Sequence, residues 1–285
     1  MGLGRKVRAW MSIIRIGNAA SIGLAAIVGY WVAGGSSIAT ALKLFFSAML
    51  IGGAGNVIND YADREVDAIN KPWRPIPSGA ISPREALIGF FILNGAGLAI
   101  AALLPWTCLL VAVLASIALA LYSLRLKKIL LVGNNVVALM SAINLVYGGL
   151  AAPKPLLSMF PAIYAYLLIL GREFLKGLED VEGDRRFGIK TLATEFGRRW
   201  AYVASWIVMG VLIAISPLPY ILAHFNLLYI VLATLGTDAT IVIALIAARK
   251  LDEKSAWKAT RIMKLSFVFG LLAFLVGAPR IAIWG

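Results

Sequence analysis

The sequence contains little charge for its length. Only 14% of its 285 residues are Asp, Glu, Lys or Arg, whereas a soluble domain carries about 25%. Three stretches, 16–42, 86–124 and 200–237, contain none of these four residue types. A membrane-spanning helix needs about 20 consecutive apolar residues, so the last two stretches each have room for two spans. The scarcity of charge therefore excludes an ordinary soluble domain and predicts an integral membrane protein.

Cysteine is also nearly absent. Cys108 is the only one in the chain and it lies within an apolar run. A single cysteine excludes an intramolecular disulfide, and it gives no information about the redox compartment.

Turn residues divide the chain into nine expected spans. They are 16–34, 42–60, 86–104, 106–124, 130–151, 156–176, 201–220, 227–248 and 263–283. Of the 27 Lys and Arg, all but Lys43, Lys154 and Arg280 then lie at the N-terminus or around the ends of even-numbered spans and the loops that follow them. Because positive residues mark the cytoplasmic side, we expect a plasma-membrane protein with a cytoplasmic N-terminus. The net charge of +13 then reflects topology, and no nucleic-acid partner is expected.

Most of the 14 acidic residues gather around the ends of the second and sixth expected spans. In the first group, Asn59, Asp63 and Asp67 follow one another at intervals of four residues, and in the second group Asp180 and Asp184 do the same. Residues four apart share one face of a helix. The two groups end spans that are four spans apart, which predicts an all-α fold built from a diverged duplication of four helices plus a ninth. We expect residues 1–285 to form a single membrane domain.

Carboxylates at this spacing predict a site for divalent cations, since like charges so close together repel one another without a cation. Mg²⁺ prefers oxygen ligands, typically one or two carboxylates together with phosphate oxygens of a substrate. We therefore expect the two motifs to hold two or more Mg²⁺ against a diphosphate. Basic and hydroxyl side chains near the motifs suit the outer phosphate oxygens. The candidates are Lys71, Arg74, Tyr122, Lys127, Lys176, Arg185 and Lys190.

Polar residues inside the expected spans carry weaker signals. Asn135, Asn144 and Tyr147 in the fifth span either line a pocket for an acceptor substrate or bridge helices, and the sequence leaves both interpretations open. Asp238 is the one acid well inside a span, and we expect a structural partner for it, with Thr237 or Asn226 as candidates.

The motifs are similar to those of a known family. Residues 59–79, which begin Asn-Asp-x-x-Asp-x-x-x-Asp, resemble the first signature of the UbiA superfamily of intramembrane prenyltransferases. Residues 180–192 resemble its second signature, and residues 122–128 resemble a third, weaker element. The resemblance covers the whole chain in length, span number and motif placement. It implies a nine-helix fold, a cytoplasmic cap over the diphosphate and a lipid-facing groove for the prenyl tail. The Mg²⁺ ligands that it implies are Asn59, Asp63, Asp67, Asp180 and Asp184.

The resemblance also implies a reaction, the Mg²⁺-dependent transfer of a prenyl group from its diphosphate, with Asp63, Asp67, Asp180 and Asp184 as catalytic residues. Residues 171–176 are similar to the archaeal branch that makes glyceryl ether lipids. The expected donor is geranylgeranyl diphosphate and the expected acceptor is geranylgeranylglyceryl phosphate, both embedded among membrane lipids. Aromatic acceptors such as 4-hydroxybenzoate, or a chlorophyllide, are alternatives.

A carrier for anionic lipids is an alternative of a different class. Duplicated helices suit a carrier, but alternating-access carriers bind their cargo near the bilayer midplane, whereas these acids cluster at one end of the spans.

Overall fold

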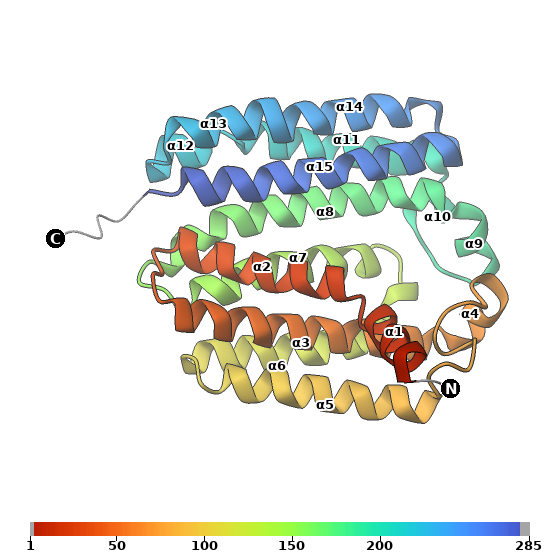
Figure 1. The fold of residues 1–285 in the computed structure, drawn as a ribbon. Helices are drawn as coiled ribbons and strands as arrows, with labels where there is room; N and C mark the ends of the chain where they lie inside the picture. The colour runs from red at the N-terminus through yellow and green to blue at the C-terminus, as the bar shows by residue number, and fades with distance from the viewer. Residues whose placement is uncertain (1–2, 280–285) are drawn as a thin grey trace. The chain divides into compact units, whose positions relative to one another are not determined.

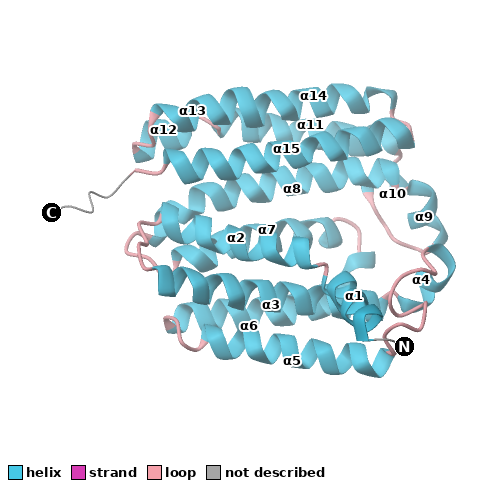
Figure 2. Cartoon of the chain, in the orientation of Figure 1, coloured by secondary structure: helices cyan, strands magenta, loops and turns pink. Residues whose placement is uncertain are grey.

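In the computed structural model, which describes residues 3–279, every regular element is helical (Figures 1 and 2). The α-helices are α1 (Leu3–Ile14), α2 (Ile16–Val32), α3 (Ile38–Ala62), α4 (Arg64–Asn70), α5 (Pro83–Ala101), α6 (Trp106–Leu124), α7 (Val132–Gly149), α8 (Met159–Glu179), α9 (Val181–Arg186), α10 (Leu192–Glu195), α11 (Arg198–Ile215), α12 (Leu218–Ala223), α13 (Leu227–Val231), α14 (Ala239–Ala247) and α15 (Glu253–Gly277). Single turns or short stretches of other helix types are η1 (Leu126–Lys128), η2 (Pro155–Ser158), η3 (Leu232–Asp238, a π-helix) and η4 (Ala248–Lys250).

The chain divides into two compact units. The first comprises Met1–Ile27 and Ser36–Leu126, and the second comprises Val28–Gly35 and Lys127–Gly285. Each unit contains one of the two aspartate motifs, as a duplication predicts.

In the first unit, α3 packs against α1, α5 and α6. Ala9 and Ile13 of α1 are buried against Val57 of α3 and against Ile76 and Ile81 of the loop that precedes α5. Ser82 begins α5 with a capping box, in which its hydroxyl accepts from the amide of Glu85. A capping box satisfies amide groups that the first turn of a helix leaves without partners. The loop after the first motif is therefore fixed between α1 and the start of α5.

In the second unit, α8 packs against α7, α11 and α15. Its core includes Leu168 and Leu175 of α8, Met209 of α11 and Met263 of α15. The end of α2 approaches α7 so closely that a Cβ on Gly29 would lie 1.9 Å from the carbonyl oxygen of Leu145. Glycine is therefore required at this helix crossing.

The first eight expected spans coincide with helices, and the ninth overlaps α15. Within residues 3–279, however, fewer than nine helices meet the length and composition that a membrane span requires. Among the described residues, seven helices are long and apolar enough to cross a membrane. The pair α1 and α2, bent by 47° at Arg15, makes up to eight. The remaining expected span, at 130–151, corresponds to α7, which is not among them because Asn134, Asn135 and Asn144 lower its hydropathy. The chain is an integral membrane protein, and nine is an approximate count of its spans.

The last expected span, 263–283, is displaced. Helix α15 begins at Glu253 and ends at Gly277, so most of the loop expected between the last two spans is helical. The side chain of Asp252 accepts a hydrogen bond from the amide of Ser255 at 2.7 Å and caps this earlier start. The charged first turns of α15 hid its beginning from a search for apolar runs, and the end of the expected span lies outside the described residues.

Candidate active site

Both aspartate motifs lie where one helix ends and a shorter helix begins. Asp63 joins α3 to α4 with φ −89° and ψ 1°, and Asp180 joins α8 to α9 with φ −97° and ψ 4°. Backbone hydrogen bonds from each aspartate to the residue four positions earlier continue across both joints. Each motif is nevertheless divided between two helices at the corresponding aspartate, where an uninterrupted helix was expected. Equal backbone geometry at corresponding residues supports the duplication.

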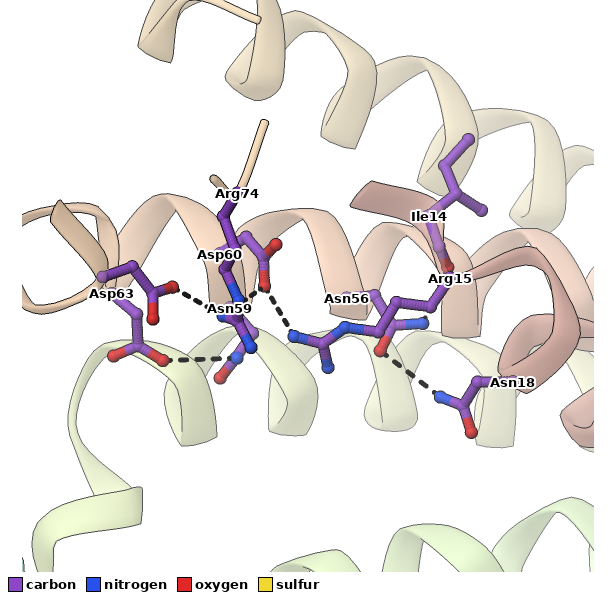
Figure 3. Close-up of polar contacts among 9 residues, drawn as sticks. Ile14, Arg15, Asn18, Asn56, Asn59, Asp60, Asp63 and Arg74 are labelled. Atoms are coloured by element: carbon purple, nitrogen blue, oxygen red, sulfur yellow. Dashed lines mark hydrogen bonds and ion pairs between the residues drawn. The ribbon is translucent and has the colours of Figure 1, made fainter. Parts of the chain in front are cut away.

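The first motif is already held by polar contacts (Figure 3). Asn59 Nδ2 donates to Asp63 Oδ2 at 3.3 Å. Asp67 is 4% exposed, and its Oδ2 accepts from Arg74 Nη1 at 2.5 Å. Arg74 was expected to bind a diphosphate, and in this structure its guanidinium lies on a predicted metal ligand.

The second motif places two carboxylates one turn apart. Lys176 Nζ lies 3.7 Å from Asp180 Oδ2. Burial, together with the negative charge of Asp180, raises the pKa of Asp184 to about 6. A raised pKa means that the ionised carboxylate is disfavoured in this environment, so a bound cation would stabilise it.

The other side chains expected to bind the diphosphate are divided between the two units, as the motifs are. Lys71 is exposed in the first unit, where Tyr122 lies half-buried near the end of α6. In the second unit Arg185 and Lys190 are exposed. The amide of Lys190 donates to the carbonyl of Lys128 at 3.4 Å. This contact brings the segment that carries Lys127 beside the end of the second motif, although the two are far apart in the sequence.

The donor groups fit magnesium. Carboxylate and amide oxygens are the hard ligands that Mg²⁺ prefers. Within residues 3–279, no group of three or more His, Cys, Asp and Glu side chains lies close enough to hold a metal by protein ligands alone. Mg²⁺ commonly takes only one or two carboxylates and completes its octahedron with water and phosphate oxygens, so a substrate-completed site agrees with this arrangement.

The residues expected in an acceptor pocket are spread along α7. Asn135 accepts from the hydroxyl of Tyr166, Asn144 donates to the carbonyl of its own helix at Met140, and Tyr147 is buried. Twelve residues of helix separate Asn135 from Tyr147, a rise of about 18 Å. The three residues therefore lie along the length of α7, with Asn135 nearest the end that follows Lys128, and their part in an acceptor pocket stays a prediction.

Asp238 has a different partner from those expected. Its Oδ2 accepts from Ser216 Oγ at 2.7 Å, whereas Oδ1 is buried without a partner. Asn226 instead caps α13 and donates to Val276. Asp238 lies in the π-helix and borders a cavity that is lined by Tyr164, Ser216, Tyr229, Thr237 and apolar side chains. The cavity lining includes none of the expected site residues.

Asp60 was not among the expected site residues, yet it lies at the first motif. This residue is 4% exposed, and its Oδ1 accepts from Arg15 Nη2 at 2.6 Å and from Arg74 Nη1 at 3.2 Å. The only signal in the sequence was an acid next to Asn59 and an arginine just before the first long uncharged stretch.

Fold and site together define a class: a helical protein that crosses the membrane several times and carries an aspartate motif at the end of a span in each of two related units. Residues 22–268 match the UbiA prenyltransferase family. The chain belongs to this family.

Known relatives agree with this assignment. The chain is 40% identical to the digeranylgeranylglyceryl phosphate synthase of Sulfolobus acidocaldarius, over 96% of this chain and 99% of the relative. Among solved structures, a digeranylgeranylglyceryl phosphate synthase in membranes matches with a TM-score of 0.80 and 31% identity, covering 96% of this chain and 98% of the other. A UbiA homolog from Archaeoglobus fulgidus, bound to DMAPP and Mg²⁺, matches with a TM-score of 0.67 and 18% identity over 94% of this chain and 99% of the other, a likeness of fold.

Proposed function

We propose that this protein transfers a geranylgeranyl group from its diphosphate to a hydroxyl of geranylgeranylglyceryl phosphate, a step that makes archaeal ether lipids. The observation that carries the proposal is the pair of aspartate motifs at matching helix joints. The name of the Sulfolobus acidocaldarius relative, which aligns over nearly its full length, supports the acceptor.

The site residues receive roles from their chemistry. We propose that Asn59, Asp63 and Asp67 in one unit and Asp180 and Asp184 in the other act on one diphosphate, so that the two units work as a single domain. Bound Mg²⁺ would supply positive charge for the departing diphosphate. Further positive charge for its outer oxygens would come from Lys71, Arg74, Lys127, Lys176, Arg185 and Lys190, with the Tyr122 hydroxyl as a donor.

The reaction begins with cleavage of the bond between the prenyl C1 and the diphosphate oxygen. The electron pair leaves with the diphosphate, and charge stabilisation of the leaving group lowers the barrier. The acceptor hydroxyl oxygen then bonds to the allylic carbocation and loses its proton to the released diphosphate or to one of the aspartates. Exclusion of water protects the carbocation from hydrolysis. A site under a cytoplasmic cap at the membrane would favour this exclusion.

We further propose that both motifs face the cytoplasm. The support is the confinement of nearly all Lys and Arg to one set of loops, which marks the cytoplasmic side. Single cysteines at Glu65 and at Glu182, both exposed, should react with a membrane-impermeant maleimide only in inside-out vesicles. Labelling of the two positions from opposite sides would contradict a shared site.

An enzyme is distinguished from a carrier by chemical turnover. Purified protein in detergent, with Mg²⁺, geranylgeranyl diphosphate and the lipid acceptor, should release diphosphate in proportion to ether product, and excess chelator should stop both. A carrier would instead move labelled lipid across liposomes without forming product. Undiminished product formation in chelator would remove the metal from the proposal.

A further inference from the structure

Asp60 is a buried acid that is not among the proposed metal ligands. Its Oδ1 contacts Arg15 and Arg74, at 2.6 Å and 3.2 Å (Figure 3). The same Arg74 Nη1 lies 2.5 Å from Asp67 Oδ2. The same guanidinium nitrogen of Arg74 therefore contacts both Asp67, a proposed metal ligand, and Asp60, which is not one. All four residues belong to the first unit.

The charges of these four groups balance. Two arginines face two carboxylates, and both carboxylates are 4% exposed. A buried charge without a partner is costly. If one charged side chain leaves the group, another charge of the same sign must therefore take its place to keep the group neutral. If Asp67 turns towards a cation, Arg15, Arg74 and Asp60 are left with one excess positive charge, which an anion compensates.

We propose that Asp60 is a positioning residue, which holds Arg74 on Asp67 until a diphosphate takes over the guanidinium and Asp67 becomes free to bind metal. The inference rests on the proposed function, and it adds an order of events at the same site. The first motif then binds metal and diphosphate together, and binds metal alone poorly. Asp60 keeps its contact with Arg74 in both states and so limits where the guanidinium moves.

A second feature ties Asp60 to the N-terminal bend. Arg15 has a φ of 52°, in the left-handed region that non-glycine residues rarely adopt. Asn56, one turn before Asp60, also contacts this bend, because its Nδ2 donates to the carbonyl of Ile14 at 2.9 Å. Asn56 thus contacts the same bend through a neutral hydrogen bond and does not bond to Arg74, which makes it a control for the helix packing.

The first experiment measures metal binding without turnover. Mn²⁺, which suits the same oxygen ligands, is titrated by electron paramagnetic resonance into purified wild-type protein and into Arg74→Gln, with and without inorganic diphosphate. Arg74→Gln should bind Mn²⁺ alone about tenfold more tightly than wild type, because hydrogen bonds to charged groups contribute enough to account for that factor. Diphosphate should tighten Mn²⁺ binding in wild type much more than in the variant.

Arg64→Gln is the charge-matched control. Arg64 lies in the same motif, but it bonds to the Tyr61 carbonyl and to Glu65. Its replacement removes one positive charge without uncovering Asp67, so Mn²⁺ affinity should change much less than in Arg74→Gln. Equal gains in the two variants would mean that general electrostatics explains the effect, and an unchanged affinity in Arg74→Gln would overturn the inference. If wild type binds no Mn²⁺ even with diphosphate, the proposed function itself fails.

The second experiment separates positioning from a structural role. Asp60→Asn should raise the KM for geranylgeranyl diphosphate about tenfold, the effect of a lost charged hydrogen bond, with a smaller change in kcat. Asn56→Ala should leave this KM unchanged, although it weakens the same helix packing. If both variants change only the yield of folded protein, or raise KM equally, Asp60 acts through the fold and the positioning role is wrong.

Discussion

Asp63→Asn, Asp67→Asn, Asp180→Asn and Asp184→Asn should each lower kcat for prenyl transfer by roughly a hundredfold or more, the scale on which a single lost electrostatic contact to a transition state reduces turnover. Asparagine keeps the size of each side chain and removes the negative charge that a cation requires. The loss should appear in steady-state product formation at saturating substrates. It should be equally severe for the two units, because both motifs are proposed to act on one diphosphate.

Glu182→Gln is the matched control for these variants. Glu182 is exposed on α9 between Asp180 and Asp184, so its change also removes one carboxylate from the motif. We expect nearly full activity, since the helix periodicity predicts that the Glu182 side chain points away from the face that Asp180 and Asp184 share. A loss as large as that of Asp180→Asn would show that the assignment of this face is wrong, and thermal stability measured in parallel checks that each variant is folded.

The helices were predictable because apolar length is a strong signal. Uncharged runs marked the spans, and the first eight expected spans coincide with helix, whereas the ninth overlaps α15. The error arises where polarity and helix formation disagree. Helix α15 begins among charged residues that a hydropathy search rejects, ten residues before the expected start of the last span.

The joints at Asp63 and Asp180 were not predictable from spacing. An interval of four residues suits an unbroken helix, and the backbone hydrogen bonds at that interval persist across each joint. The bend comes from the local torsion angles of one residue in each motif. No turn residue such as glycine or proline marks either position, so the sequence contained no sign of it.

The contacts of Asp60 depend on tertiary structure. Arg15 lies 45 residues and Arg74 lies 14 residues from it along the chain. The sequence placed several basic residues near the motif but did not indicate which of them pairs with which acid. The same limit explains Asp238, whose partner Ser216 comes from the end of another helix, 22 residues away.

The choice of acceptor should produce the second large effect. We propose that the cations near the two motifs serve two phosphorylated substrates, with Arg125, Lys127 or Lys128 as candidate partners of the acceptor's own phosphate. The family resemblance implies a groove that opens to the bilayer, and a lipid acceptor would reach such a site without leaving the hydrocarbon region. We therefore expect kcat/KM for geranylgeranylglyceryl phosphate to exceed that for 4-hydroxybenzoate or a chlorophyllide by at least about a hundredfold, as expected when a site for a polar group meets a substrate that lacks it.

The most direct test of the account is product analysis by mass spectrometry after purified protein is incubated with Mg²⁺, geranylgeranyl diphosphate and these three acceptors together. The account predicts a glyceryl ether that carries two geranylgeranyl chains and one phosphate, and no such product when Mg²⁺ is chelated. Prenylation of 4-hydroxybenzoate alone would contradict the lipid acceptor. If neither the purified protein nor membranes that contain it form any prenylated product, prenyl transfer itself would be contradicted.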